Sequence, residues 1–110
     1  MKAIQAIIET KLPLPPGKVL LIKVNGEESL VPYQSDLSTL INAPALDHVT
    51  LTRSLVMFCD DMGRYKPHLG LNKKGSELYK TRCRPEYHDQ CYIIGDVILV
   101  DDDGFDKEDV

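Results

Sequence analysis

The clearest pattern of apolar and polar positions is a pair of apolar runs around Asn25-Gly26, in the stretch "KVLLIKVNGEESLVPY". Both central residues of a type I′ turn need a positive φ, which Asn and Gly tolerate best. The pattern therefore predicts a β-hairpin over roughly residues 19–33. Pro32 cannot donate a ladder hydrogen bond, so we expect the second strand to end there or to lie at a sheet edge.

Three further stretches have strand-like patterns. "KAIQAII" alternates near the start and is rich in β-branched residues, which predicts a strand, and the three prolines of "KLPLPPG" then predict an extended connector. "HVTLTRSLVMFCDDMGRY" alternates and then runs apolar, which predicts a second hairpin followed by a tight turn with Gly63 in a left-handed conformation. "CYIIGDVILV" predicts a last strand, in which Gly95 suggests a bulge or a close backbone approach.

Two stretches predict short helices. In "SDLSTLINAP", Ser35 is a plausible N-cap, apolar residues recur at i, i+3 and i+4 from Leu37, and Pro44 stops the helix. "NKKGSELYK" predicts a second helix, which Asn72 would cap and whose Leu78 would face inward.

The predicted order is strand, hairpin, helix, hairpin, helix, strand. Strands joined by short turns favour an α+β fold, with a mainly antiparallel sheet of about five to six strands and two short helices. A chain of 110 residues that is 43% hydrophobic suits a single domain. We expect that domain to span residues 1–100, with 1–17 as strand and Pro-rich connector, and residues 101–110 to form a flexible acidic tail.

Composition limits the setting of the protein. No segment reaches the ~18 to 20 apolar residues of a membrane span, and the first residues lack the pattern of a secretory signal. The three cysteines cannot all pair within one molecule, and an odd count without a signal favours a reducing cytosol. The expected location is the cytoplasm, without membrane attachment.

The candidate chemistry is sparse. Cys83, His88 and Cys91 lie within nine residues, with His68 upstream, but their spacing departs from the close cysteine pairs of zinc sites and no clear fourth ligand follows. A nucleophile elbow and a phosphate-binding glycine loop are both missing. We therefore expect no catalytic residues, no cofactor and no metal, although a zinc site on these residues is left open.

Charge is distributed unevenly. The formal net charge is −4, and the last ten residues hold six acids and one lysine, so residues 1–100 carry 12 bases and 11 acids, or +1. From position 64 to position 84 there are seven bases and one acid, or +6. The simplest interpretation of such a run is a solvated face, and a binding surface is the alternative.

Tyrosines are interleaved with these cations, a composition that favours binding. Phosphates attract cations and nucleobases stack on aromatic rings, while tyrosine with arginine is equally typical of protein–protein hot spots. The candidate surface comprises Arg64, Tyr65, Lys66, Lys73, Lys74, Tyr79, Lys80, Arg82, Arg84 and Tyr87. An acidic protein face is the preferred partner, because no dedicated nucleic-acid motif accompanies the cations, and a nucleic acid or nucleotide is the alternative. The acidic tail would compete for the same surface.

The region from about residue 18 to residue 100 resembles a bacterial domain family of unknown function, found largely in phages and plasmids. The resemblance is carried by "SDLSTLINAPALDHVTL", "SLVMFCDDMGRYKPHLGLNKKGSELY" and "YIIGDVILV". The matching positions are Asp60, Asp61 and Gly63 in the turn, Leu71 and Asn72 at the helix start, and Gly95 in the last strand. The chain departs from the family pattern at its N-terminal segment, at the insert "KTRCRPEYHDQ" and at its acidic tail.

The resemblance implies a genomic setting rather than an activity, because the family carries no established catalytic residues. It implies a small protein of a phage or other mobile element. The resulting hypothesis is a non-catalytic protein that acts by stoichiometric binding and inhibits a host or defence protein.

Overall fold

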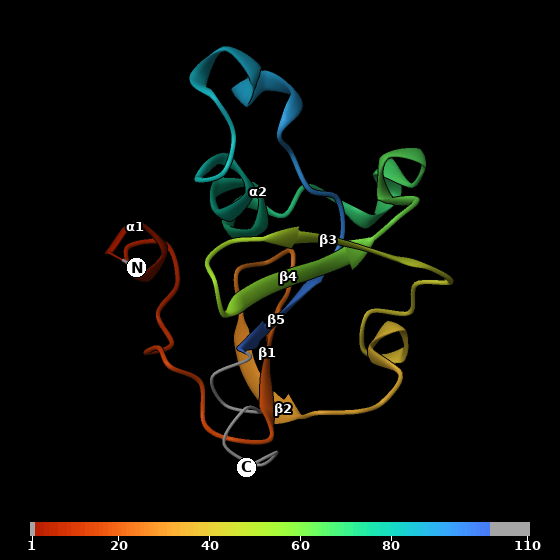
Figure 1. Cartoon of the computed structure of the whole chain (residues 1–110). Helices are drawn as coiled ribbons and strands as arrows, with labels where there is room; N and C mark the ends of the chain where they lie inside the picture. The colour runs from red at the N-terminus through yellow and green to blue at the C-terminus, as the bar shows by residue number, and fades with distance from the viewer. Residues whose placement is uncertain (1, 102–110) are drawn as a thin grey trace.

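A computed structural model describes residues 2–101 of the chain. Within that range five antiparallel strands form one sheet in the order β2-β1-β5-β4-β3 (Figure 1). This architecture confirms the predicted α+β class with an antiparallel sheet. The strands are β1 (Lys18–Ile22), β2 (Glu28–Pro32), β3 (Leu46–Thr50), β4 (Leu55–Asp60) and β5 (Val97–Asp101). The helical elements are α1 (Lys2–Gln5), α2 (Lys73–Lys80) and the 3-10 turns η1 (Leu37–Leu40), η2 (Gly63–Tyr65), η3 (Pro67–Leu69) and η4 (Pro85–Gln90).

The hairpin predicted around Asn25-Gly26 is confirmed, since β1 pairs with β2 from Lys18↔Pro32 to Ile22↔Glu28. Its predicted turn type was wrong. The Gly26 N–H donates to Lys23 O at 2.9 Å, and Gly26, at φ 94, has a positive φ that Asn25 does not share. This is a three-residue loop with a left-handed glycine at its end. A side chain from the other end of the domain supports the loop, because the Val24 N–H donates to Asp96 Oδ1 at 2.9 Å.

Substituting Gly26 tests this turn. A β-branched residue resists a positive φ, so Gly26→Val should lower the free energy of unfolding by about 1–3 kcal/mol in chemical denaturation. Gly26→Asn is the matched control and should cost less, because asparagine tolerates a left-handed backbone. Equal stability of the valine variant and the wild type would contradict the observed turn.

The second predicted hairpin is also present, with β3 paired to β4 from Leu46↔Asp60 to Thr50↔Val56. The prediction of a left-handed Gly63 was wrong, because this glycine begins the 3-10 turn η2 without a positive φ. A glycine is needed there for a different reason. A Cβ at position 63 would come 2.9 Å from the Ile94 carbonyl oxygen, so the backbones of two distant segments meet at this point.

The strand predicted for "KAIQAII" was wrong. Residues 2–5 form the short helix α1, and the Ile7 and Ile8 N–H groups both donate to Ile4 O. Ile4 and Ile8 are each 3% exposed, so the buried positions follow the i, i+4 spacing of a helical turn rather than the alternation of a strand. A strand here would have lacked a place beside β1, whose two sides are occupied by β2 and β5.

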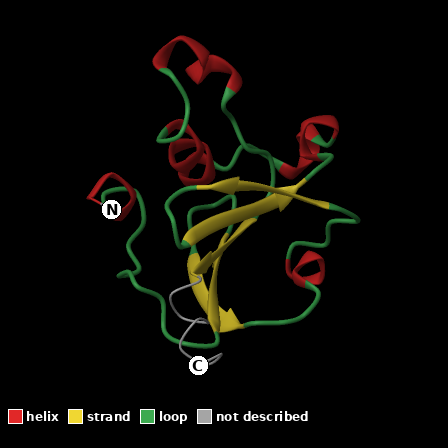
Figure 2. Ribbon diagram, in the orientation of Figure 1, coloured by secondary structure: helices red, strands yellow, loops and turns green. Residues whose placement is uncertain are grey.

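The two faces of the sheet are covered unequally. One face packs against α1, Leu14 and α2, around a core that includes Leu20, Met57 and Leu99. On the opposite face Val19, Ile98 and Val100 are covered mainly by the side chains around η1. Figure 2 shows this layering, with helical segments on both sides of the strands.

The helix predicted at residues 35–44 is shorter than expected. It is the single 3-10 turn η1, and its N-cap is Asp36, which accepts from the Ser38 N–H, rather than Ser35. The short side chain of Asp36 reaches the free N–H two residues on, which fixes the start of the turn one position later.

Helix α2 agrees with its prediction. Leu78 is fully buried, and the Asn72 Oδ1 caps the helix by accepting from the Gly75 N–H at 2.8 Å. The Asn72 Nδ2 also donates to Ile22 O at 3.1 Å and to Gly95 O at 3.0 Å. This buried side chain thus joins α2 to β1 and to the segment that leads into β5.

The fold includes at least one residue beyond the predicted end of the domain. Asp101, assigned to the acidic tail by the sequence, is the last residue of β5 and is 2% exposed. Its Oδ2 accepts a hydrogen bond from the Leu14 N–H at 3.0 Å, which secures the N-terminal connector. Residues 102–110 of the predicted tail lie outside the described residues.

Candidate binding surface and adjoining hollow

Two of the predicted surface cations have ion-pair partners inside the fold. Lys66 Nζ lies 2.7 Å from Asp60 Oδ2, and Lys74 Nζ lies 2.6 Å from Glu28 Oε2. Lys74 also donates to the Gly26 carbonyl at 2.8 Å. The carboxylate partners are only 4% exposed, so both lysines compensate buried charge and are held in place. They contribute to the architecture rather than to an open surface.

Arg64 is fixed by the segment before β5. Its Nη2 donates to the Gln90 carbonyl at 2.7 Å, and its guanidinium lies 4.9 Å from the centroid of the Tyr92 ring. An arginine over an aromatic face gains a cation–π contribution and loses side-chain freedom. Arg64 thereby connects η2 to residues 90–92.

The other predicted cations lie on α2 and just after it. Lys73 and Lys80 lie about two helical turns apart on α2, and the Lys80 Nζ lies 3.8 Å from the Glu77 Oε1. Arg82 and Arg84 follow the helix and are exposed. The structure thus gathers Lys80, Arg82 and Arg84 at the C-terminal end of α2.

The three predicted tyrosines have different surroundings. Tyr65 is 79% exposed and Tyr87 is 52% exposed, whereas Tyr79 is partly buried against the core. Tyr87 lies on η4, within the segment that follows Arg84. Tyr87 is therefore the exposed tyrosine closest in the chain to Arg84, and its N–H donates to the Arg84 carbonyl.

A disulfide closes the segment that carries Tyr87. Cys83 is bonded to Cys91 across eight positions, and Cys59 is a free, buried cysteine. The odd cysteine count thus corresponds to one pair and one core thiol. In Figure 1 the light-blue segment after α2 projects beyond the helix, away from the sheet. We call residues 83–91 the cystine loop.

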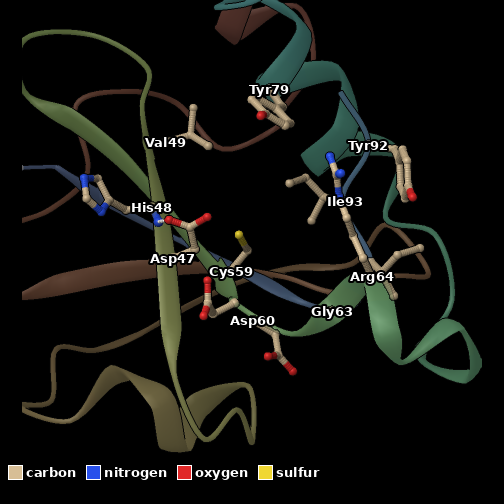
Figure 3. Close-up of a pocket in the computed structure, with 12 residues that line it drawn as sticks. Asp47, His48, Val49, Cys59, Asp60, Gly63, Arg64, Tyr79, Tyr92 and Ile93 are labelled. Carbon is tan, nitrogen blue, oxygen red and sulfur yellow. Dashed lines mark hydrogen bonds between the residues drawn. The ribbon is translucent and has the colours of Figure 1, made fainter. Parts of the chain in front are cut away.

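A polar hollow of about 170 Å³ lies beside this region, between β3, β4, η2, α2 and residues 92–94. Figure 3 shows the side chains of Asp47, Cys59 and Asp60 on one side of it, and Arg64 with Tyr92 on the other. The hollow is smaller than the ~300–1,000 Å³ typical of sites for drug-sized ligands.

The hollow does not hold an activated nucleophile among its described residues. Burial raises the pKa of the Cys59 thiol to about 11, and the nearby carboxylates of Asp47, Asp60 and Asp61 add to the increase. The His48 ring contacts the ring of Phe58, which neighbours Cys59 in β4 and so points to the opposite face of the sheet. Cys59 therefore stays a neutral thiol at physiological pH, and the ring of His48 lies on the other face of the sheet from it.

The next feature is the placement of possible metal ligands. Among residues 2–101, no three His, Cys, Asp or Glu side chains are grouped so as to hold an ion. The Cys83 and Cys91 sulfurs, on which a zinc site was left open, are bonded to each other, and the His88 Nε2 lies 3.2 Å from the Cys83 carbonyl oxygen. Over the same residues, no helix has the length and apolarity needed to cross a bilayer.

Several of these contacts escaped the sequence analysis. Tyr92 and Gln90 hold Arg64 from 26 or more positions away, and Glu28 meets Lys74 across 46 positions. Periodicity and local spacing report only neighbours in the chain, so they contain no signal for such pairs. The cystine loop had a partial signal in the x7 spacing of its cysteines, but spacing alone does not establish a bond.

Comparisons of the chain with protein-family models, with curated proteins and with solved structures found no match. The resemblance over residues 18–100 therefore stays a hypothesis, and functional inference depends on the geometry above.

Proposed function

We propose that the protein is a non-catalytic binding module that acts stoichiometrically on an acidic face of a partner protein. The contact surface would be the C-terminal end of α2 together with the cystine loop. Its principal side chains would be Lys80, Arg82, Arg84 and Tyr87.

The observation that carries the proposal is that exposed arginine and tyrosine side chains lie on or next to a loop closed by a disulfide. Arg82, Arg84 and the half-exposed Tyr87 stand on or beside a loop that a covalent bond closes. Arginine and tyrosine are enriched at interface hot spots. A closed loop loses less conformational freedom on binding than an open one, which favours affinity.

Charge within the loop favours a protein partner over a nucleic acid. Glu86 and Asp89 are exposed on the same loop as Arg84 and Tyr87, and the whole chain carries a net charge of −4. Acidic groups among the cations would repel a phosphate backbone, which binds mainly by charge neutralisation. A protein face can match a mixed pattern, with acids opposite the arginines and donors opposite the carboxylates.

The biological setting follows from the family resemblance. We propose a cytoplasmic protein of a phage or another mobile element, which inhibits a host or defence protein by occupying its surface. The Cys59 thiol, neutral at physiological pH and on the opposite face of the sheet from the His48 ring, supports the non-catalytic assignment. The proposal requires no cofactor.

A charge-reversal capture experiment tests the surface. The full chain is immobilised and exposed to nuclease-treated cell lysate at physiological salt, in wild-type form and as Lys80→Glu/Arg82→Glu/Arg84→Glu. A matched control, Lys11→Glu/Lys18→Glu/Lys23→Glu, makes the same change in net charge at exposed lysines elsewhere. We expect the wild type and the control to retain the same partner, and the loop variant to lose it by ~100-fold in affinity, since several charged contacts are reversed at once.

Two outcomes would contradict the proposal. If the loop variant still retains the partner, the three cations do not contribute to binding and form only a solvated surface. Capture that disappears on nuclease treatment, with a steep dependence on salt, would favour the nucleic-acid alternative. Circular dichroism of all three proteins verifies that each variant is folded.

A further inference from the structure

The cystine loop is attached to the domain by few groups. Residues 84–90 are exposed apart from the half-buried His88. Within the loop, η4 is held by short-range bonds such as Tyr87 N–H to Arg84 O at 2.9 Å, and the Arg64 side chain binds it at the Gln90 carbonyl. A segment with little buried apolar surface gains little stability from packing. The Cys83–Cys91 bond is therefore the main constraint on the conformation of the loop.

The two sulfurs differ in accessibility. Cys91 is 4% exposed, whereas Cys83 is half-buried and lies three residues after the end of α2. Exchange proceeds by attack of a thiolate on one sulfur, and access decides which one. An external thiol would meet the Cys83 Sγ first, with the Cys91 Sγ as the leaving group.

The bond is also coupled to Arg64. Gln90 and Tyr92, the two neighbours of Cys91, are the residues that hold the guanidinium. The Cys91 N–H donates to the His88 carbonyl at 3.2 Å, so a movement of residue 91 would also disturb the last turn of η4. Opening the disulfide would thus loosen the loop and the residues that fix Arg64 at the hollow.

We propose that Cys83–Cys91 is a reversible redox switch that sets the conformation of the cystine loop, and thereby the affinity of the surface assigned above; the cytoplasmic setting and the effect on affinity both rest on the proposed function. In a cytoplasmic setting a protein disulfide is usually transient or redox-sensing rather than structural. The oxidised protein holds the loop closed and is the binding-competent form. The reduced protein has an open loop and binds less tightly.

The reaction balances with a dithiol reductant. One reductant thiolate attacks the Cys83 Sγ, breaks the S–S bond and releases Cys91 as a thiolate, which takes up a proton. The second reductant thiol then attacks the mixed disulfide, gives up its proton and releases Cys83. Two electrons and two protons pass to the protein, and the reductant leaves as its own disulfide.

Limited proteolysis tests the switch without any partner. The wild type is equilibrated in oxidised glutathione or in dithiothreitol, and trypsin cleavage after Arg82 is followed by mass spectrometry. We expect thiol titration under denaturing conditions to find one free thiol in the oxidised form and three in the reduced form. Cleavage after Arg82 should be at least about tenfold faster once the loop-closing bond is broken.

The bond after Arg53, an exposed residue in the turn between β3 and β4, is the internal control and should be cut at the same rate in both states. Cys83→Ser/Cys91→Ser should behave as the reduced form under both conditions. Equal cleavage after Arg82 in the two states overturns the switch, and so do three free thiols after oxidation. Faster cleavage at both bonds shows global unfolding and also overturns it, because the disulfide is then structural.

The partner captured by the wild type separates this proposal from the proposed function. We expect reduction to weaken that complex at least about tenfold, following the loss of loop closure. If cleavage responds to reduction but the charge-reversal variant still binds, the loop opens as proposed and the assigned surface is wrong. If charge reversal abolishes binding while reduction changes neither cleavage nor affinity, the surface stands and the switch is wrong.

Discussion

Replacing Asn72 with alanine is expected to lower the free energy of unfolding by about 3–5 kcal/mol, because the helix cap and two buried hydrogen bonds to carbonyl groups are lost. Asn72 is fully buried and satisfies the Gly75 N–H, the Ile22 carbonyl and the Gly95 carbonyl with one side chain. Domains of this size are stable by only ~5–15 kcal/mol. Urea denaturation followed by circular dichroism measures the change.

Asn25→Ala is the matched control for Asn72→Ala. Asn25 is exposed, and its Oδ1 accepts a hydrogen bond from the Glu27 N–H at 2.9 Å. Because water can replace that contact, we expect a loss below about 1 kcal/mol. Similar losses for the two variants would show that Asn72 does not connect α2 to the sheet as described.

The second large effect concerns Glu28. Burial would raise the pKa of Glu28, but hydrogen bonds from Lys74, from the Glu9 and Thr10 N–H groups and from the Thr10 hydroxyl outweigh it and lower the pKa to about 2. The ordinary value is 4.5, and one pKa unit corresponds to ~1.36 kcal/mol, so the ionised form stabilises the fold by about 3 kcal/mol. Glu28→Gln should lose about that much at pH 7.

The sign of the pH dependence follows from the lowered pKa. The contribution of Glu28 is fully present above about pH 4.5 and is lost as the pH falls through about 2. The gap in unfolding free energy between wild type and Glu28→Gln should therefore narrow between these values. Glu27→Gln, at the exposed neighbouring position, should leave stability nearly unchanged. A gap that stays constant from pH 7 to pH 2 would contradict the assignment.

Local patterns predicted the fold where neighbours in the chain decide it. The apolar runs around Asn25-Gly26 were enough for the first hairpin, but the turn type depends on Asp96, 72 positions from Val24. Likewise, Asn72 was recognisable as a helix cap, whereas its bonds to Ile22 and Gly95 exist only after β1 and β5 have paired. The strand assigned to residues 2–8 failed because a short alternating run is also compatible with a helical turn, in which Ile4 and Ile8 share one buried face.

Only the local part of the candidate site could be predicted, because the sequence pattern does not show contacts between residues far apart in the chain. The cationic run was visible in composition, but which cations stay exposed depends on Asp60 and Glu28, the partners of Lys66 and Lys74. Charge counting treats all seven bases alike, although burial of a partner carboxylate commits two of them to the fold. The proposed contact surface therefore uses Lys80, Arg82 and Arg84, which follow one another at the end of α2.

The most direct test of the binding surface is a nuclear magnetic resonance titration of the ¹⁵N-labelled, oxidised full chain with its captured partner. The proposal predicts that backbone amide signals shift or broaden from Lys80 to Cys91, and that those of β3 (Leu46–Thr50) remain unchanged. It also predicts that the changes vanish for Lys80→Glu/Arg82→Glu/Arg84→Glu. Changes confined to β3, or to the sheet face beneath η1, with the cystine loop unaffected, would contradict it.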